Sequence, residues 1–304
     1  MNIWRWLAAV FLCGAVAVLA EDKTEVPDLE KFKAARQKLV ASLKPKQGKV
    51  DLHSGLATIN VPPQYYFLGS DDTATVVYKL WGNPPSKAKP LGLLYPANEP
   101  LLGTNGWAVV FEYEEDGYVK DDDASTTDYT KMMEDMKAGA QKANKRRLDE
   151  GYPSVEIIGW AAPPHYDHDT HKLYWAKEIK FGDSDENTLN YDLRMLGRKG
   201  VLSLNVVAQM SRLKDVEAAN PEILAMVDFN AGHRYTDFKP GSDKMATYGV
   251  AALVAGGFAA AKLGLFKGLL VALLAAKKLI IVAFVAVAGF IKKLFNGRRS
   301  NNVQ

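Results

Sequence analysis

Residues 163–171, PPHYDHDTH, place three histidines and two aspartates within nine consecutive positions. Zinc and copper bind imidazole and carboxylate groups whose side chains converge on the ion. The candidate metal ligands are therefore His165, Asp167 and His171. Their spacing matches no strong zinc signature. The alternative is the polar end of a β-hairpin, in which His168 is a solvated loop residue.

The sequence contains none of the familiar signatures of catalysis. It has no GxSxG elbow, no HExxH pair, no phosphate-binding Walker loop and no GxGxxG turn. Three consecutive acids, Asp121 to Asp123, lack the alternating acids and central glycine of a calcium loop. We interpret them as acids ahead of a helix N-terminus, where the helix dipole favours negative charge. No cofactor is predicted, apart from the divalent metal that the histidine stretch could hold.

The segments around the histidines are predicted to be strands. Residues 155–162 and 171–179 flank them, and two more strand-like runs follow at 186–196 and 201–208. Consecutive strands with short connections indicate antiparallel neighbours. Earlier in the chain, the alternation of apolar and polar residues predicts a hairpin at 48–62 and a half-buried strand at 107–115.

Helices are predicted between these strands. The main one starts at Thr126 or Thr127, carries an apolar stripe rich in methionine and ends at Gly151. Further helices are expected at 28–43, 71–81, 211–219 and, after Asn220 as cap, 221–227. The predicted fold class is α+β, an antiparallel sheet covered by helices, with a C-terminal helical membrane anchor.

Both ends of the chain carry apolar segments. Residues 1–20 combine Arg5, an apolar run and a small residue at Ala20, which predicts a cleaved secretory signal, with an uncleaved anchor as the alternative. Residues 245–266 carry only one charge, and their 22 residues can cross a bilayer, which needs about 20. The alternative is an Ala- and Gly-rich segment buried in the soluble core. The predicted division is a signal at 1–20, a periplasmic α+β domain at 21–243 and an anchor with a basic tail at 244–304.

Small residues recur at every fourth position of the predicted anchor, and on a helix they form one stripe that another helix could approach closely. They are Ala252, Gly256, Ala260, Gly264 and Gly268. The following stretch is interrupted by Lys277 and Lys278. It could be a basic helix lying in the membrane interface or a second span that returns across the bilayer. The first alternative, with one span and the body outside the cytoplasm, agrees better with the positive-inside tendency.

The distribution of charge separates the body from the tail. Residues 21–243 carry 28 basic and 35 acidic side chains, a net charge of −7, whereas every charged residue after Asp243 is basic. Nucleic acid is not predicted as a partner, because phosphate binding needs clustered basic residues on the folded domain. The only cysteine, Cys13, lies in the predicted signal, so the exported chain could form no disulfide. Membrane lipid is the predicted partner of the C-terminal segment.

Several blocks of the chain resemble a bacterial family of predicted membrane-anchored proteins of unknown function. They include GYVKDDDA, GYPSVEIIGWAAPPHYD, HKLYWAKEI, NTLNYDLRMLGRKGVLSLNVVA and YGVAALVAGGFAAAKLGLF, and the similarity spans residues 45–299. The resemblance implies an envelope protein with a membrane anchor. It implies no activity and no catalytic residues, and in the family pattern His168 does not recur.

The sequence therefore favours a non-enzymatic protein of the bacterial inner membrane, with its main domain in the periplasm. The domain would bind another envelope component while the tail holds it to the membrane. One alternative is a metal- or carboxylate-dependent hydrolase of a cell-wall or small-molecule substrate. Another is a membrane organiser that self-associates through the small-residue stripe.

Overall fold

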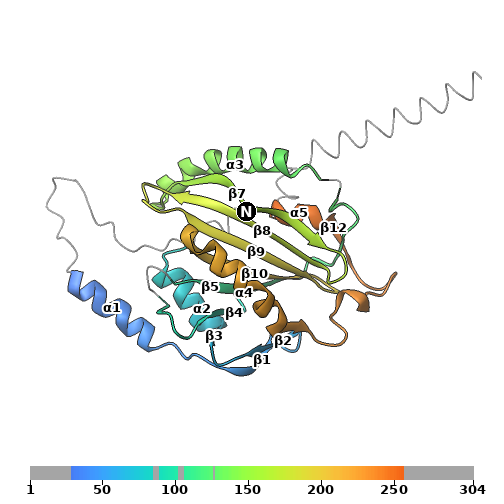
Figure 1. Cartoon of the computed structure of the whole chain (residues 1–304), viewed down its shortest axis with the longest axis horizontal. Coiled ribbons are helices and arrows are strands. Elements are labelled where there is room, and N and C mark those ends of the chain that lie inside the picture. The colour runs from blue at the N-terminus through green and yellow to red at the C-terminus, as the bar shows by residue number, and fades with distance from the viewer. Residues whose placement is uncertain (1–28, 85–88, 102–105, 126, 257–304) are drawn as a thin grey trace, which may run out of the picture. The chain divides into compact units, whose positions relative to one another are not determined.

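The computed structural model describes residues 29–84, 89–101, 106–125 and 127–256 (Figure 1). Its centre is a seven-stranded antiparallel sheet in the order β3-β4-β5-β10-β9-β8-β7, accompanied by a three-stranded sheet, β1-β2-β11, and the strand pair β12-β6. The predicted mixture of helices with antiparallel strands is therefore confirmed. The predicted signal at 1–20 and the part of the predicted anchor beyond Gly256 lie outside the described residues.

The central sheet contains strands that are buried on both faces, and β10 is buried along all but its last residue. The seven strands are β3 (Tyr65–Gly69), β4 (Gly92–Pro96), β5 (Ala108–Glu114), β7 (Val155–Asp167), β8 (Lys172–Phe181), β9 (Thr188–Leu196) and β10 (Val201–Gln209). The smaller strands are β1 (Gly48–Leu52), β2 (Ala57–Val61), β6 (Tyr118–Lys120), β11 (Val227–Phe229) and β12 (Met245–Gly249). Of these, the sequence predicted the hairpin β1–β2, the strand β5 and the four strands from β7 to β10, but not β3, β4, β6, β11 or β12.

Helices cover both faces of the sheet. They are α1 (Leu29–Ala41), α2 (Ser70–Ala74) with the π-helix η1 (Thr75–Leu80), α3 (Tyr129–Asp149), α4 (Leu213–Met226) with the short 3-10 helix η2 (Met210–Arg212) before it, and α5 (Val250–Val254). Another 3-10 helix, η3 (Tyr235–Asp237), follows β11. In Figure 1, α3 runs along β7 and α4 crosses the strands on the other side.

The largest core cluster lies between the sheet and α4. It joins α4 and the strands β2 and β11 to one face of β3, β5, β9 and β10, and its fully buried members include Phe67, Phe111, Leu193, Leu204 and Ile223. Phe67 and Phe111 pack edge to face, with ring centroids 5.8 Å apart. Burial of this apolar surface is the main force that holds α4 and the small sheet against the central sheet.

Two predicted helices, 211–219 and 221–227, form a single helix, α4, with Pro221 inside it. Proline removes one backbone hydrogen bond from a helix interior. Val216, Ile223 and Met226, on both sides of the proline, are buried in the core below the helix. This packing outweighs the lost hydrogen bond, and it explains why the helix continues through Pro221 instead of dividing into two.

The N-terminus of α3 is capped by Asp128 and not by Thr126 or Thr127. The Asp128 carboxylate accepts hydrogen bonds from the backbone N–H groups of Thr130 and Lys131, each at 3.0 Å. A carboxylate suits this position better than a hydroxyl, because it satisfies two free N–H groups and carries a charge that the helix dipole favours. Met133 and Ala140 of α3 then pack on Ile157 of β7.

The opposite face of the sheet contains buried charges. Asp192 on β9 lies 3.1 Å from Lys177 Nζ and 2.8 Å from Arg194 Nη2, and its side chain is only 2% exposed. Both cations also lie over the Trp175 ring, at 5.8 and 5.1 Å from its centroid. One carboxylate and one indole thus hold two buried cations on adjacent strands.

The first ten residues of the predicted membrane span belong to the folded body. Met245–Gly249 form β12, which pairs in parallel with β6, and Val250–Val254 form the buried helix α5. Val250 and Leu253 pack in a cluster with Leu173 and Trp175 of β8. Residues 245–254 therefore belong to the fold, with α5 buried and β12 half-buried. No helix within the described ranges is both long and apolar enough to cross a bilayer.

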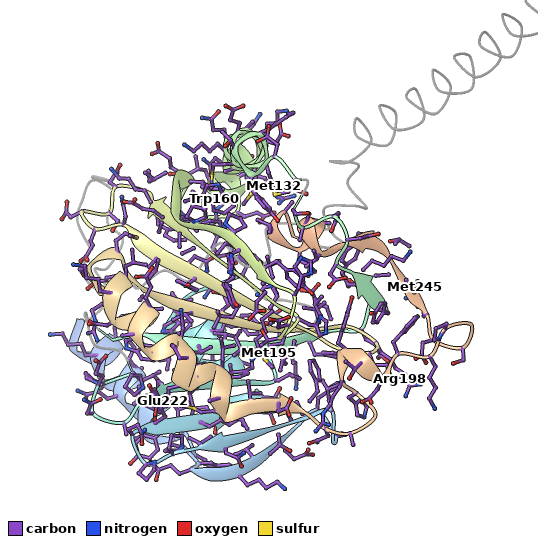
Figure 2. All side chains as sticks on the ribbon, turned by 45° about the vertical axis from the view of Figure 1, so that its right-hand side comes forward. Met132, Trp160, Met195, Arg198, Glu222 and Met245 are labelled. Atoms are coloured by element: carbon purple, nitrogen blue, oxygen red, sulfur yellow. The ribbon has the colours of Figure 1, made fainter. Side chains whose placement is uncertain are left out.

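An ion pair ties the segment before β12 to the β9–β10 turn. Arg198 Nε and Nη2 donate to the two carboxylate oxygens of Asp243 at 2.7 and 2.9 Å, and Lys239 N donates to the same carboxylate at 2.7 Å. Arg198 lies beside this segment in Figure 2. The hydrogen bonds from Arg198 lower the pKa of Asp243 to about 2.

Because the pKa of Asp243 is lower in the folded state than the usual 3.8, its contribution to stability is complete above pH 4 and is lost as the pH falls toward about 2. We expect Asp243→Asn to lower the melting temperature at pH 6 and to lower it by less at pH 3. Scanning calorimetry of the full chain at both values measures the difference. If Asp243→Asn lowers the melting temperature equally at pH 3 and pH 6, the ion pair does not set the pKa of Asp243.

Candidate functional site

The histidine stretch forms the end of the β7–β8 hairpin. β7 continues through Asp167, so the strand is longer than predicted and only residues 168–171 form the turn. Asp167 organises this turn, because its carboxylate accepts hydrogen bonds from the N–H groups of Asp169 at 2.9 Å and Thr170 at 3.2 Å. It also accepts one from Thr170 Oγ1 at 2.7 Å. These bonds lower the pKa of Asp167, with the largest effect from the Thr170 hydroxyl.

The three candidate metal ligands do not converge. His165 and Asp167 alternate with Tyr166 along β7 and share its outer face, where the His165 ring stacks on Tyr174 at 5.5 Å. His171 instead directs its Nδ1 toward Tyr166 Oη, 3.4 Å away. Among the residues that the structure describes, no group of three His, Cys, Asp or Glu side chains is placed to hold a metal ion.

Asp121 is the centre of the polar contacts at this hairpin. Its carboxylate accepts a hydrogen bond from Tyr166 Oη at 2.8 Å and lies 3.6 Å from His168 Nδ1 and 3.7 Å from His171 Nδ1. Burial alone would raise the pKa of Asp121, but the hydrogen bonds led by that of Tyr166 outweigh it and hold the pKa below its usual value. Asp121 is therefore an anion that draws Tyr166 and two histidines toward the end of β6.

Aromatic rings pack behind this carboxylate. Tyr118 stacks between Tyr235 and Phe238, with ring centroids 4.4 and 3.9 Å apart, and the His171 ring lies 4.2 Å from that of Tyr235. Tyr235 Oη donates to the backbone carbonyl of Val119 at 3.0 Å. Burial raises the pKa values of Tyr235 and Tyr166 far above the usual value, so both keep their protons at neutral pH.

The acids at 121–123 serve separate elements and do not precede a helix N-terminus as a group. Asp121 holds the β7–β8 hairpin, whereas Asp123 Oδ1 accepts a hydrogen bond from Ala251 N at 3.2 Å, near the start of α5. A Cβ at Gly249 would come within 2.2 Å of the Asp123 carboxylate, so a larger residue there would push this carboxylate away. The segment after β6 thus joins the hairpin to α5.

An open cavity of about 430 Å³ lies beside the cluster. Its walls come from the end of the β7–β8 hairpin, from β9, and from the stretch that runs from the last turn of α4 through β11 to η3. They consist of Thr170, His171, Lys172, Met195, Leu196, Leu224, Ala225, Val227, Asp228, Phe229, Arg234, Tyr235 and Thr236. Figure 2 shows Met195 on the same side of the sheet as Glu222 of α4. His171 and Tyr235 belong to both the cavity wall and the cluster, so a ligand in the cavity would contact the cluster directly.

The predicted small-residue stripe is described at only two positions. Ala252 is buried within α5, and Gly256 follows that helix with a φ of +106°. Ala260, Gly264 and Gly268 lie outside the described residues. Packing of this stripe against another helix stays a prediction.

Sequence reasoning found His171 but missed most of its partners. Asp121 and Tyr166 are separated by 45 positions, and Tyr235 by 64 from His171, so no local pattern connects them. The available signal was that Asp121 lies in the block GYVKDDDA and Tyr166 in the block ending PPHYD, both singled out by the family resemblance. The structure brings these two blocks into contact.

Comparisons with known proteins give a family without an assigned activity. A family model described as "Protein of unknown function (DUF2167)" matches residues 44–288. No curated protein matches the chain. Among solved structures, cyanobacterial PsbP (CyanoP) from Synechocystis sp. PCC 6803 is similar, with 9% identity over 60% of this chain and 91% of that one and a TM-score of 0.35. The Saccharomyces cerevisiae Ran-binding protein Mog1p is also similar, with 11% identity over 65% of this chain and 100% of that one and a TM-score of 0.30.

Proposed function

The chain belongs to the DUF2167 family of proteins of unknown function, and from that premise we propose that it is a non-enzymatic binding module of the bacterial envelope. Its binding site is the cavity at the end of the β7–β8 hairpin. The family supplies no activity, so the proposal rests on the residues of the site.

One observation carries the proposal: the open cavity is walled by His171 and Tyr235, which the Asp121 cluster holds in place. At about 430 Å³ the cavity is within the range of small-molecule sites, about 300–1,000 Å³. Such sites combine apolar walls with a few fixed polar groups. Here His171 is held on one side by Tyr235 and on the other by Asp121 and Tyr166.

The polar contacts favour binding over catalysis. The hydroxyl groups in the wall belong to Thr170, Tyr235 and Thr236, and the tyrosine hydroxyl is donated to Val119. The shortest contact of Asp121 is with Tyr166, at 2.8 Å, while His171 Nδ1 is 3.7 Å away. In a catalytic dyad the carboxylate would make its close hydrogen bond with the histidine.

The envelope location is part of the proposal and is supported by the sequence. Residues 1–20 have the form of a secretory signal, and the body of net charge −7 is followed only by basic residues. We propose that membrane attachment is made by residues after Gly256, because residues 245–254 pack within the body. The cavity would then face the periplasm.

A hydrolase is the second candidate, and one contact favours it. Asp121 lies behind His171, and His171 borders the cavity, so Asp121 could orient His171 as a general base. A hydrolase would convert ester or amide ligands placed in the cavity and lose that activity in His171→Gln. A binding module returns the same ligands unchanged.

Met195 provides a reporter for the cavity. With methionine methyl groups labelled with ¹³C in the full chain, we expect the Met195 resonance to shift when small aromatic or aliphatic compounds bind, because its side chain lines the wall. Met133, buried between α3 and β7, is the matched internal control and is expected to stay unchanged. Shifts at Met133 alone, or at neither residue across a compound library, would contradict the proposed site.

A further inference from the structure

The charges around the cavity indicate the class of its ligand. Building on the proposed binding function, we propose that the cavity takes a small organic anion, with a carboxylate or phosphate head group held by Lys172 and Arg234 and an apolar body held by the wall between β9 and α4. The family has no assigned ligand, and no sequence motif indicates this one.

Lys172 lines the cavity at the start of β8. It lies opposite Asp167 in the β7–β8 register, but the Asp167 carboxylate is occupied by the N–H groups and hydroxyl of its own turn. Over the described stretches of chain Lys172 makes no ion pair. Its side chain is half-buried at the cavity, where an ammonium gains more from an anion than it would in open solvent.

The Arg234 side chain has one hydrogen bond and one long ion pair. Its Nε donates to the Phe229 carbonyl at 3.3 Å, while its Nη2 is 3.8 Å from the Asp228 carboxylate. Both side chains of that pair are largely exposed, at 54% and 76%. The guanidinium therefore keeps donors free for a second anion, and its planar fork suits a carboxylate or phosphate.

The tightly paired arginines of the body contrast with Arg234. Arg198 is bound by Asp243, Arg212 by Glu99 and Arg194 by Asp192, each with a contact of 2.7 or 2.8 Å. Among the wall residues, the two cations Lys172 and Arg234 face a single carboxylate, that of Asp228, so the wall carries an excess of positive charge.

The rest of the wall is partly apolar. Met195, Leu196, Val227 and Phe229 line the same cavity, together with the hydroxyl groups of Thr170 and Thr236. An anion with a hydrocarbon or aromatic body can pack against these apolar side chains, which phosphate alone cannot do.

Asp228 is the carboxylate that the ligand must displace. It lines the cavity and is the ion-pair partner of Arg234, so it competes with an incoming anion for the guanidinium. Removing its charge would leave Arg234 fully available. This predicts the unusual result that Asp228→Asn binds the anion more tightly than the natural chain does.

A matched pair of ligands tests the inference on the full chain. The compounds 4-hydroxybenzoate and 4-hydroxybenzamide have nearly the same shape and differ by one negative charge. Following the Met195 methyl resonance, we expect the benzoate to bind about tenfold more tightly than the amide, because a fixed cation is worth about 1.4 kcal/mol or more to an anion. Equal affinities, or tighter binding of the amide, would overturn the inference.

Three variants locate the charge that causes the preference. Lys172→Gln is expected to remove most of the preference for the benzoate over the amide. Lys180→Gln, on the same strand but outside the cavity wall, is expected to leave both unchanged. Asp228→Asn is expected to raise the benzoate affinity. A preference that is equally reduced in the two lysine variants would refute the role of Lys172.

The same titration separates this inference from the proposed function. If the amide shifts Met195 as strongly as the benzoate, the cavity is a binding site but not for anions. If neither compound shifts it, both statements are wrong. Nanodiscs of phosphatidylglycerol and of phosphatidylcholine then distinguish the source of the anion. Competition with the benzoate by the anionic lipid alone identifies a lipid head group, and no competition identifies a soluble anion.

Discussion

Replacing Asp192 with alanine is expected to lower the free energy of unfolding by about 3–5 kcal/mol, because it leaves two buried cations without their carboxylate. Lys177 and Arg194 are both close to Asp192 and are 9% and 12% exposed, so neither can recover its charge solvation by a small movement. The Trp175 ring remains over both cations but offsets only part of the loss. Urea unfolding of the full chain, followed by tryptophan fluorescence, measures the change.

The control for this experiment is another aspartate in an ion pair. Asp135 on α3 pairs with Lys131 at 3.0 Å, but both side chains are more than 60% exposed. Asp135→Ala is expected to change the unfolding free energy little, because water replaces the lost partner. If Asp192→Ala and Asp135→Ala lower the free energy of unfolding by similar amounts, the buried charges on β8 and β9 are not coupled through Asp192.

Replacing Asp121 with alanine is expected to weaken both the fold and the site. The variant loses the carboxylate that accepts the Tyr166 hydroxyl at 2.8 Å, and a hydrogen bond to a charged group contributes about 1.5–3 kcal/mol. It also frees His168 and His171 from their shared anion. We therefore expect a lower free energy of unfolding together with weaker ligand-induced shifts of Met195.

The neighbouring residue is the matched control, since Asp122 has the same side chain but is exposed. Asp122→Ala is expected to change stability by less than about 0.5 kcal/mol and to leave the Met195 shifts unaltered. If Asp121→Ala lowers stability while ligand binding is unchanged, the cluster supports the hairpin but does not shape the cavity.

Much of the fold could be predicted because local patterns carry it. The runs at 155–162, 171–179, 186–196 and 201–208 are strand-like and are separated by Pro, Gly, Asp and Lys, and they form β7 to β10. β3 and β4 were missed because Tyr65–Gly69 and Gly92–Pro96 are short apolar runs without alternation. β12 was missed because its residues open a long apolar stretch that hydropathy assigns to a membrane.

The site was harder to predict because its residues meet through tertiary structure. The concentration of histidines drew attention to the hairpin, but strand alternation sends His165 and Asp167 to one face while His171 contacts Tyr166 and Asp121. Lys172 and Arg234 have no sequence signature at all. Their role follows only from the absence of a close anionic partner within the described residues, which depends on where Asp167 and Asp228 place their carboxylates.

The most direct test of the proposed binding site is the Met195 methyl resonance of the full chain in the presence of a small-molecule extract of the bacterial envelope. We expect a shift in the natural chain and none in Ala225→Trp, where an indole at this exposed position of α4 fills the cavity. A Met195 resonance that the extract leaves unmoved in the natural chain, or moves equally in the filled variant, would contradict the claim that this cavity is the binding site.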